Sequence, residues 1–220
     1  MYDITAIIPA RGNSERLPNK NLLPLANKPL IAHSIDFAKQ NGIEKIIVST
    51  DSEKIADTAS KYGAEVIIRP KELATSTSPT IETLKHVVDK LNRVTRQIVL
   101  LQPTNPLRPQ NLLKNCLKDF FDGSYDSLMT VTRNHQKFGK IIDEKFVPFN
   151  YALGQRSQDL EPLFFENGLI YITKTELIKQ GKILGENNCP FIVNHPFALV
   201  DIDTQEDFDY AEYLYNKHNK

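Results

Sequence analysis

The chain has 220 residues, a length that favours one domain with a sizeable buried core. Its 27 Lys and Arg residues balance 27 Asp and Glu residues, so no basic excess indicates a nucleic-acid partner or a charged membrane surface. No apolar run approaches the roughly 20 residues of a membrane span, and the opening run at 4–8 is too short for a signal peptide, so we expect a cytoplasmic protein. The two cysteines lack a CxxC spacing, so we expect both thiols to be reduced.

Runs rich in Ile and Val alternate with stretches of helical spacing along the first 120 residues. We predict strands at residues 4–8, 46–48, 66–68 and 98–101. Helices are expected at about 29–41, 51–63, 79–91 and 112–120, the second of them opened by a capping box at Thr50 and Glu53. A further strand is expected at 169–172 and a last helix from about Thr204. The repeated strand–helix order predicts an α/β fold, with a mostly parallel sheet and helices on both faces.

The alternation weakens between about residues 133 and 166. This stretch is polar, contains Pro148, Gly154 and Pro162, and shows little periodicity. We interpret it as an excursion from the core in the form of an extended hairpin, within a single domain that spans residues 1–220.

The loops that follow the strands are the candidates for chemistry, because ligands bind beyond the carboxyl ends of the strands in an open α/β sheet. In the first loop, Gly12 allows backbone amides to converge on an anion, and Arg11, Arg16 and Lys20 add positive charge. The loop is either a phosphate site or a solvated basic surface, and its position directly after the first strand favours the phosphate site. Its spacing matches neither GxGxxG nor GxxxxGK[ST], which argues against dinucleotide and Walker-type sites.

The loop at residues 102–109 holds three prolines and the neutral hydrogen-bonding side chains of Gln102, Thr104 and Asn105. These groups suit sugar hydroxyls or the edge of a base, although the loop could also simply lead into the next helix.

Two acidic positions each admit two interpretations. In the strand-like run at residues 200–203, Asp201 and Asp203 would face the same side and could hold Mg²⁺ together with substrate phosphates. Alternatively, Asp203 caps the final helix and Asp201 is only exposed. Asp51 either belongs to a helix cap or is the phospho-accepting aspartate of a signalling receiver.

Five segments, taken in chain order, resemble the CMP-N-acylneuraminate synthetases, also called acylneuraminate cytidylyltransferases. They are IIPARGNSERLPNKN, IIVSTDSEKIADTASKYGAEVIIRPKELATSTS, LLQPTNPLR, RSQDLEPLFFENGLIYI and DIDTQEDF. The resemblance implies a Rossmann-like nucleotidyltransferase fold and a homodimer in which the excursion at about 133–166 reaches the partner subunit. It also implies Mg²⁺-dependent transfer of CMP from CTP to the anomeric hydroxyl of an acidic nine-carbon sugar, with release of pyrophosphate.

The resemblance also assigns roles to individual residues. It places the charge stabilisation of the reaction on Arg11, Lys20, Asp201 and Asp203, and Mg²⁺ on the two aspartates. CTP would be held by Ala10, Arg11, Gly12, Ser14, Arg16, Lys20, Asn21, Arg69, Thr77 and Thr80. The sugar would be held by Gln102, Thr104, Lys140, Arg156, Asn167 and Phe191, with Lys137 as the alternative to Lys140.

The first loop departs from the family pattern at Glu15, where family members usually carry Lys, and Arg16 would supply the missing charge. The run SERLP is similar to the related synthetases that activate 3-deoxy-octulosonate. Two alternatives therefore accompany the main interpretation, namely a CMP-3-deoxy-octulosonate synthetase and a nucleotide-binding subunit without activity.

Overall fold

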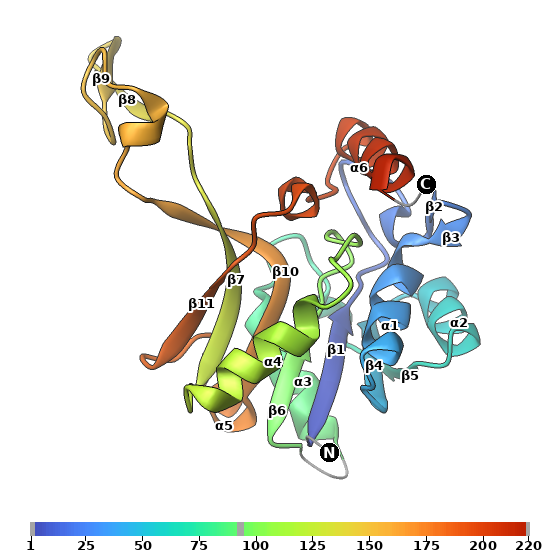
Figure 1. The fold of residues 1–220 in the computed structure, drawn as a ribbon. Helices are drawn as coiled ribbons and strands as arrows, with labels where there is room; N and C mark the ends of the chain where they lie inside the picture. Colours follow the sequence, from blue (N-terminus) through green and yellow to red (C-terminus); the bar gives the residue numbers. More distant parts are fainter. Residues whose placement is uncertain (1–2, 92–94, 219–220) are drawn as a thin grey trace.

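The computed structural model describes residues 3–91 and 95–218. Within these ranges, the main sheet has seven strands in the order β11-β7-β10-β6-β1-β4-β5 (Figure 1). The strands are β1 (Ile4–Pro9), β4 (Lys45–Thr50), β5 (Glu65–Ile68), β6 (Gln97–Leu100), β7 (Ser127–Arg133), β10 (Phe164–Lys174) and β11 (Asn188–Ile192). Among them, β10 alone runs antiparallel to its neighbours β6 and β7. The predicted α/β fold with a mostly parallel sheet is confirmed.

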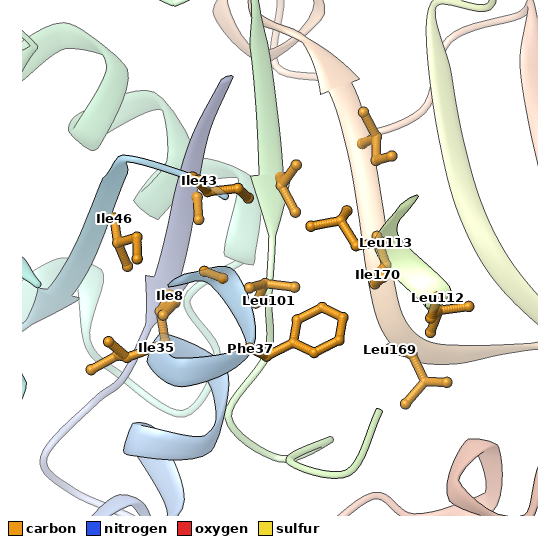
Figure 2. Packing of buried hydrophobic residues seen from close by; sticks show 14 of the residues in the cluster. Ile8, Ile35, Phe37, Ile43, Ile46, Leu101, Leu112, Leu113, Leu169 and Ile170 are labelled. Atoms are coloured by element: carbon orange, nitrogen blue, oxygen red, sulfur yellow. The ribbon is translucent and has the colours of Figure 1, made fainter. Parts of the chain in front are cut away.

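Helices cover both faces of this sheet because its strands bury side chains on both sides. Successive side chains of a strand point to opposite faces, and accordingly Ile8 and Ile7 belong to different core clusters. Figure 2 shows the first cluster, where Ile8, Leu101 and Ile170 of the sheet region lie beside helical residues. That cluster includes residues of α1 (Leu30–Gln40), α2 (Glu53–Lys61) and α4 (Leu112–Asp122), and the second includes residues of α3 (Thr80–Lys90) and α5 (Thr175–Lys179).

A third cluster fixes the first loop against the end of the chain. Leu17 of that loop packs with Ile202 and with Phe208 of α6 (Gln205–His218). The short hairpin of β2 (Pro24–Leu25) and β3 (Lys28–Pro29) contributes Leu25 to the same cluster. Apolar packing therefore brings residues 9–21 close to residues 200–208, independently of any polar contact between them.

Three local predictions need correction. Residues 200–203 form no strand, so Asp201 and Asp203 are not aligned by strand geometry. The capping box at Thr50 is wrong, because α2 begins at Glu53 and its N-cap, Ser52, makes no side-chain cap bond. Strands β7 and β11 were not predicted; β11 is an edge strand that contains Pro190, which weakens its strand signal.

Residues 134–163, called the arm below, project away from the sheet (Figure 1). The expected hairpin is confirmed, with β8 (Gly139–Ile142) paired to β9 (Lys145–Pro148). Both ends of the predicted excursion belong to the main sheet, since Arg133 of β7 pairs with Phe164 of β10. The arm also includes the short 3₁₀ helix η3 (Ser157–Asp159).

Candidate active site

A cavity of about 260 Å³ lies beyond the carboxyl ends of the central strands. The first loop, the loop after β5, the start of α3 and the loop after β6 all contribute to its walls. Its lining residues are Pro9, Arg11, Ser14, Lys20, Asn21, Arg69, Leu73, Thr75, Ser76, Ser78, Thr80, Thr83, Gln102, Pro103, Thr104 and Asp203. The basic loop that we predicted to bind phosphate thus forms one wall of a real cavity, and we call this space the first cavity.

The first loop is shaped by hydrogen bonds of its own main chain. The Ala10 amide donates to the Ser49 carbonyl at 2.9 Å, and the Gly12 amide donates to Oδ1 of Asp51 at 2.8 Å. A Cβ on Gly12 would lie 2.8 Å from Cβ of Ser52, so the close approach of the two loops requires glycine. Asp51 therefore anchors the loop, and neither Ala10, Gly12 nor Asp51 is among the residues that line the cavity.

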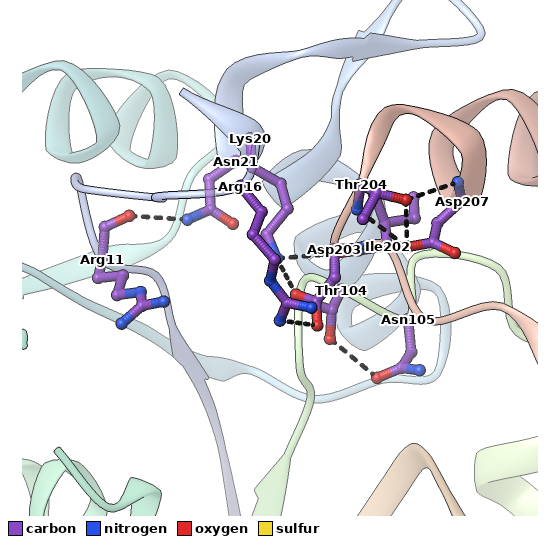
Figure 3. Close-up of polar contacts among 10 residues, drawn as sticks. All are labelled: Arg11, Arg16, Lys20, Asn21, Thr104, Asn105, Ile202, Asp203, Thr204 and Asp207. Atoms are coloured by element: carbon purple, nitrogen blue, oxygen red, sulfur yellow. Dashed lines mark hydrogen bonds and ion pairs between the residues drawn. The ribbon is translucent and has the colours of Figure 1, made fainter. Parts of the chain in front are cut away.

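Three charged side chains meet at one edge of the first cavity (Figure 3). Nζ of the buried Lys20 donates to Oδ1 of Asp203 at 2.8 Å and to the Ile202 carbonyl at 2.7 Å. Arg16, which is largely exposed, donates to Oδ2 of Asp203 at 2.5 Å. Burial alone would raise the pKa of the Asp203 carboxyl, but the hydrogen bonds and charges of Lys20 and Arg16 hold that pKa below its ordinary value.

The final helix is capped by residues other than Asp203. Oδ2 of Asp207 accepts hydrogen bonds from the amides of Asp203 and Thr204 at 3.0 and 2.9 Å, and Oγ1 of Thr204 accepts one from the Asp207 amide. This is a capping-box arrangement around Thr204. The alternative in which Asp203 is the helix cap is therefore wrong, and its carboxylate lies at the edge of the first cavity, where Lys20 and Arg16 hold it.

The far wall of the first cavity is built from Arg69 and the start of α3. Arg69 is buried and donates through Nη1 to Oγ1 of Thr83 at 2.7 Å, and burial lowers its pKa. Thr80 lines the cavity as predicted, whereas the exposed Thr77 does not and contacts Thr75 instead. Sequence reasoning missed Thr83, although it lies one helical turn after Thr80 and so shares its side of α3.

A second cavity of about 490 Å³ adjoins the first, and the two share Gln102. Of the predicted sugar-binding residues, Gln102 and Asn167 line the second cavity, while Thr104 lines the first. The full lining is Gln102, Asn105, Phe165, Glu166, Asn167, Gly168, Tyr171, Ala198, Leu199 and Asp201. The two aspartates thus lie at the junction, Asp203 in the first cavity and Asp201 in the second. Partial burial and the nearby Asp203 raise the pKa of Asp201, against a hydrogen bond from Thr104.

Arg108 supports the second cavity from behind, a role that the sequence did not indicate. Its buried guanidinium donates to the carbonyls of Gln102 and Leu169 at 2.9 and 2.8 Å and to Oγ of Ser34 at 3.0 Å. Burial lowers the pKa of Arg108 to about 9, and its hydrogen-bond acceptors are all uncharged. The loop after β6 is thereby fastened to both β10 and α1.

Three predicted sugar-binding residues lie outside the first and second cavities. In the arm, Lys140 lies over the ring of Phe149 at 5.2 Å, and Arg156 pairs with Asp159 at 2.7 Å. The alternative lysine, Lys137, is also in the arm and lies over Tyr151. Phe191 is on β11, half-buried against the main core. Within one chain, the structure therefore does not bring these side chains to the second cavity.

A Rossmann-like sheet, a basic loop after its first strand and a carboxylate facing that loop define a nucleotidyltransferase. Residues 5–219 match the family described as Cytidylyltransferase, and the chain belongs to this family. The predicted family is confirmed, and the signalling-receiver alternative is wrong. Across residues 3–91 and 95–218, no helix is long and apolar enough to cross a membrane.

Curated relatives match nearly the whole chain. The CMP-N,N'-diacetyllegionaminic acid synthase of Legionella pneumophila is 36% identical over 96% of this chain and 95% of its own. The pseudaminic acid cytidylyltransferase of Campylobacter jejuni is 31% identical over 97% of both chains. The N-acylneuraminate cytidylyltransferase of Escherichia coli is 34% identical over 99% of this chain, which spans only 53% of that relative.

Solved structures agree on the fold. A CMP:2-keto-3-deoxy-manno-octonic acid synthetase complexed with CTP has a TM-score of 0.73 at 17% identity, covering 97% of this chain and 98% of its own. A 4-diphosphocytidyl-2C-methyl-D-erythritol synthase from Anaerococcus prevotii has a TM-score of 0.67 at 17% identity, covering 98% and 96%. At these identities the likeness shows the shared fold alone.

Proposed function

We propose that the protein transfers CMP from CTP to a nonulosonic acid, a nine-carbon 2-keto sugar acid, and releases pyrophosphate. The observation that carries this proposal is the pair of adjoining cavities, with Gln102 shared and one aspartate in each. Such an arrangement suits two substrates whose reacting atoms must meet at the junction. The relatives at 30–36% identity, named for legionaminic, pseudaminic and N-acylneuraminic acids, support this substrate class over 3-deoxy-octulosonate.

In this proposal the first cavity binds CTP. Arg11, Lys20 and the main chain near Ser14 hold the triphosphate, and their charges offset the charge that develops on the departing pyrophosphate. Arg69 and Thr80 contact the cytidine. Arg69 suits this role because it lines the first cavity and its Nη1 is held by Thr83, which fixes the guanidinium in the cavity wall.

Mg²⁺ is the proposed cofactor, and Asp201 and Asp203 would hold it. They fit because Mg²⁺ is commonly bound by one or two carboxylates that substrate phosphates complement. Asp201 has no ion-pair partner among the salt bridges of the described residues, so a cation would balance its charge. When bound, Mg²⁺ supplies Lewis-acid polarisation of the phosphate oxygens. Lys20 and Arg16, which hold Asp203, fix its carboxylate at the cavity edge.

We also propose a homodimer in which the arm of one subunit reaches the second cavity of the other. The second cavity is lined by the carboxylates of Glu166 and Asp201 and by no Lys or Arg from the described residues. An acidic sugar needs a positive partner there, and Lys140 and Arg156 of a second subunit would supply it. The arm also exposes apolar side chains, among them Ile141 at 72% and Leu153 at 82%, as expected of an interface.

The test is a pyrophosphate-release assay in which CTP, UTP and ATP are each combined with a panel of acidic sugars. We expect turnover with CTP and a nonulosonic acid, a reaction that would take place in the cytoplasm. Preference for 3-deoxy-octulosonate would select the related synthetase instead. CTP binding without turnover on any sugar would identify a nucleotide-binding subunit without activity, and turnover with UTP and a neutral sugar phosphate would contradict the proposal.

A further inference from the structure

The β10 strand carries a bulge beside the second cavity. Its pairing with β7 passes from Glu166 opposite Val131 to Tyr171 opposite Met129, so β10 advances five residues while β7 advances two. Residues five apart in a regular strand face opposite sides. The bulge changes this alternation, and both Glu166 and Tyr171 line the second cavity.

The bulge is held in place by several specific contacts. Gly168 has a φ of +73°, and a Cβ there would lie 2.6 Å from Oδ1 of Asn105. Inside the bulge, Oδ1 of Asn167 accepts a hydrogen bond from Thr130 at 2.6 Å, and its Nδ2 donates to Thr132 at 3.0 Å. Most of the hydrogen-bonding capacity of the Asn167 amide is thus used within the fold, so Asn167 fixes the wall of the cavity.

The Glu166 carboxylate is oriented by a hydrogen bond, but no cation of the described residues forms an ion pair with it. The Tyr171 hydroxyl donates a hydrogen bond to its Oε1. Burial and the Glu166 carboxylate raise the pKa of Tyr171, which keeps this hydroxyl protonated as a donor. No salt bridge of the described residues involves Glu166, and Oε2 has no hydrogen-bond partner recorded among them. One oxygen of an oriented carboxylate is therefore available to a ligand in the cavity.

Building on the proposed function, we infer that Glu166 is a specificity-determining residue for the sugar: its free oxygen accepts a hydrogen bond from an N–H or O–H donor on a ring substituent or side chain of the nonulosonic acid. An ionised carboxylate only accepts hydrogen bonds, so it selects ligands that present a donor at that place. A site built to pair with such a donor discriminates strongly against an analogue that lacks it. Tyr171 is the positioning residue, because it fixes the direction of the carboxylate.

The test measures steady-state kinetics of the full-length enzyme with CTP and a nonulosonic acid. Loss of one hydrogen bond to a charged group raises the KM for the sugar roughly 10- to 100-fold in Glu166→Ala, with the KM for CTP unchanged. Tyr171→Phe raises it less, because the carboxylate remains but is no longer oriented. Glu44→Ala, which removes an exposed carboxylate outside the arm and outside the first and second cavities, is the matched control and leaves both KM values unchanged.

Deoxy analogues of the sugar then locate the donor. In the wild type, one analogue that lacks a single hydroxyl or N–H should be used markedly less well, and Glu166→Ala should remove that discrimination while the melting temperature stays unchanged. An active wild type together with an unchanged sugar KM in Glu166→Ala would overturn the inference and leave the proposed function standing. Absence of pyrophosphate release from the wild type with every nonulosonic acid would instead refute the proposed function.

Discussion

The first cavity and the arm differ in which side chains they bury and which they expose. The cavity wall includes polar side chains that are buried and held by hydrogen bonds within the fold; Lys20 is 9% exposed and Arg69 is 6% exposed. The arm has apolar side chains on its surface, and within it Arg156 forms an ion pair with the nearby Asp159. The first cavity is completed by its own chain, whereas the arm leaves apolar surface exposed.

This difference suggests how the two substrates are handled. Every group that we assign to CTP belongs to loops beside the sheet or to the start of α3 of one chain, so a single subunit should bind the nucleotide. The cations that we assign to the acidic sugar lie on the arm, beyond the reach of their own second cavity. Sugar binding should therefore depend on a second subunit, whereas nucleotide binding should not.

The largest effect is expected from Lys20→Met, which removes one of the buried positive charges of the first cavity. Loss of one preorganised contact to developing charge typically lowers kcat about 10²–10³-fold. The measurement is pyrophosphate release at saturating CTP and sugar, with circular dichroism to verify the fold. If a folded variant kept near-normal turnover, the first loop would be only a solvated surface.

Asp203→Asn and Asp207→Ala separate the proposed metal site from the helix cap four residues away. Asp203→Asn should keep the melting temperature but abolish turnover at every Mg²⁺ concentration tested. Asp207→Ala removes the side-chain half of the capping box of α6, which costs about 1 kcal/mol, or roughly 2–4 °C in melting temperature, and should leave the Mg²⁺ dependence intact. Full Mg²⁺-dependent activity in Asp203→Asn would remove this carboxylate from the proposed site.

A charge on the arm surface should affect the sugar and spare the nucleotide. Ile141→Asp and Leu153→Asp place a carboxylate on exposed apolar positions, so we expect a shift from dimer to monomer in sedimentation velocity with little change in melting temperature. The KM for the sugar should rise about 10-fold or more, and CTP affinity by calorimetry should not change. Lys145→Ala, on the same hairpin, is the control. An unaltered oligomer with an unaltered sugar KM would refute the role of the arm.

The smallest effect is expected from Arg16→Ala. Arg16 is mostly exposed, and an exposed ion pair such as Arg16–Asp203 is typically worth about 0.2–1 kcal/mol. The KM for CTP should therefore rise only about 2- to 5-fold. This small change, beside the large one for Lys20, would locate the dominant charge at the buried position. A loss as large as that of Lys20→Met would instead make Arg16 the main phosphate ligand, consistent with Glu15 standing where the family usually has Lys.

Much of the nucleotide side could be read from the sequence because its determinants are local. Buried strands appear as apolar runs, and the carboxyl ends of parallel strands share one edge of the sheet, so loops 9–21 and 102–109 had to approach each other. The same reasoning failed for β11, where Pro190 weakens the strand signal, and for residues 200–203, where alternation resembled a strand that does not form.

The α/β architecture, the basic loop after β1 and the family all follow from residue patterns along the chain. Which charges meet depends on how distant segments fold together. Lys20 and Asp203 are 183 positions apart, and they pair because Leu17 and Ile202 pack in one apolar cluster. Likewise, the bulge that brings Glu166 and Tyr171 together depends on pairing between β10 and β7. Such contacts depend on how distant segments pack, so they cannot be inferred from local residue patterns.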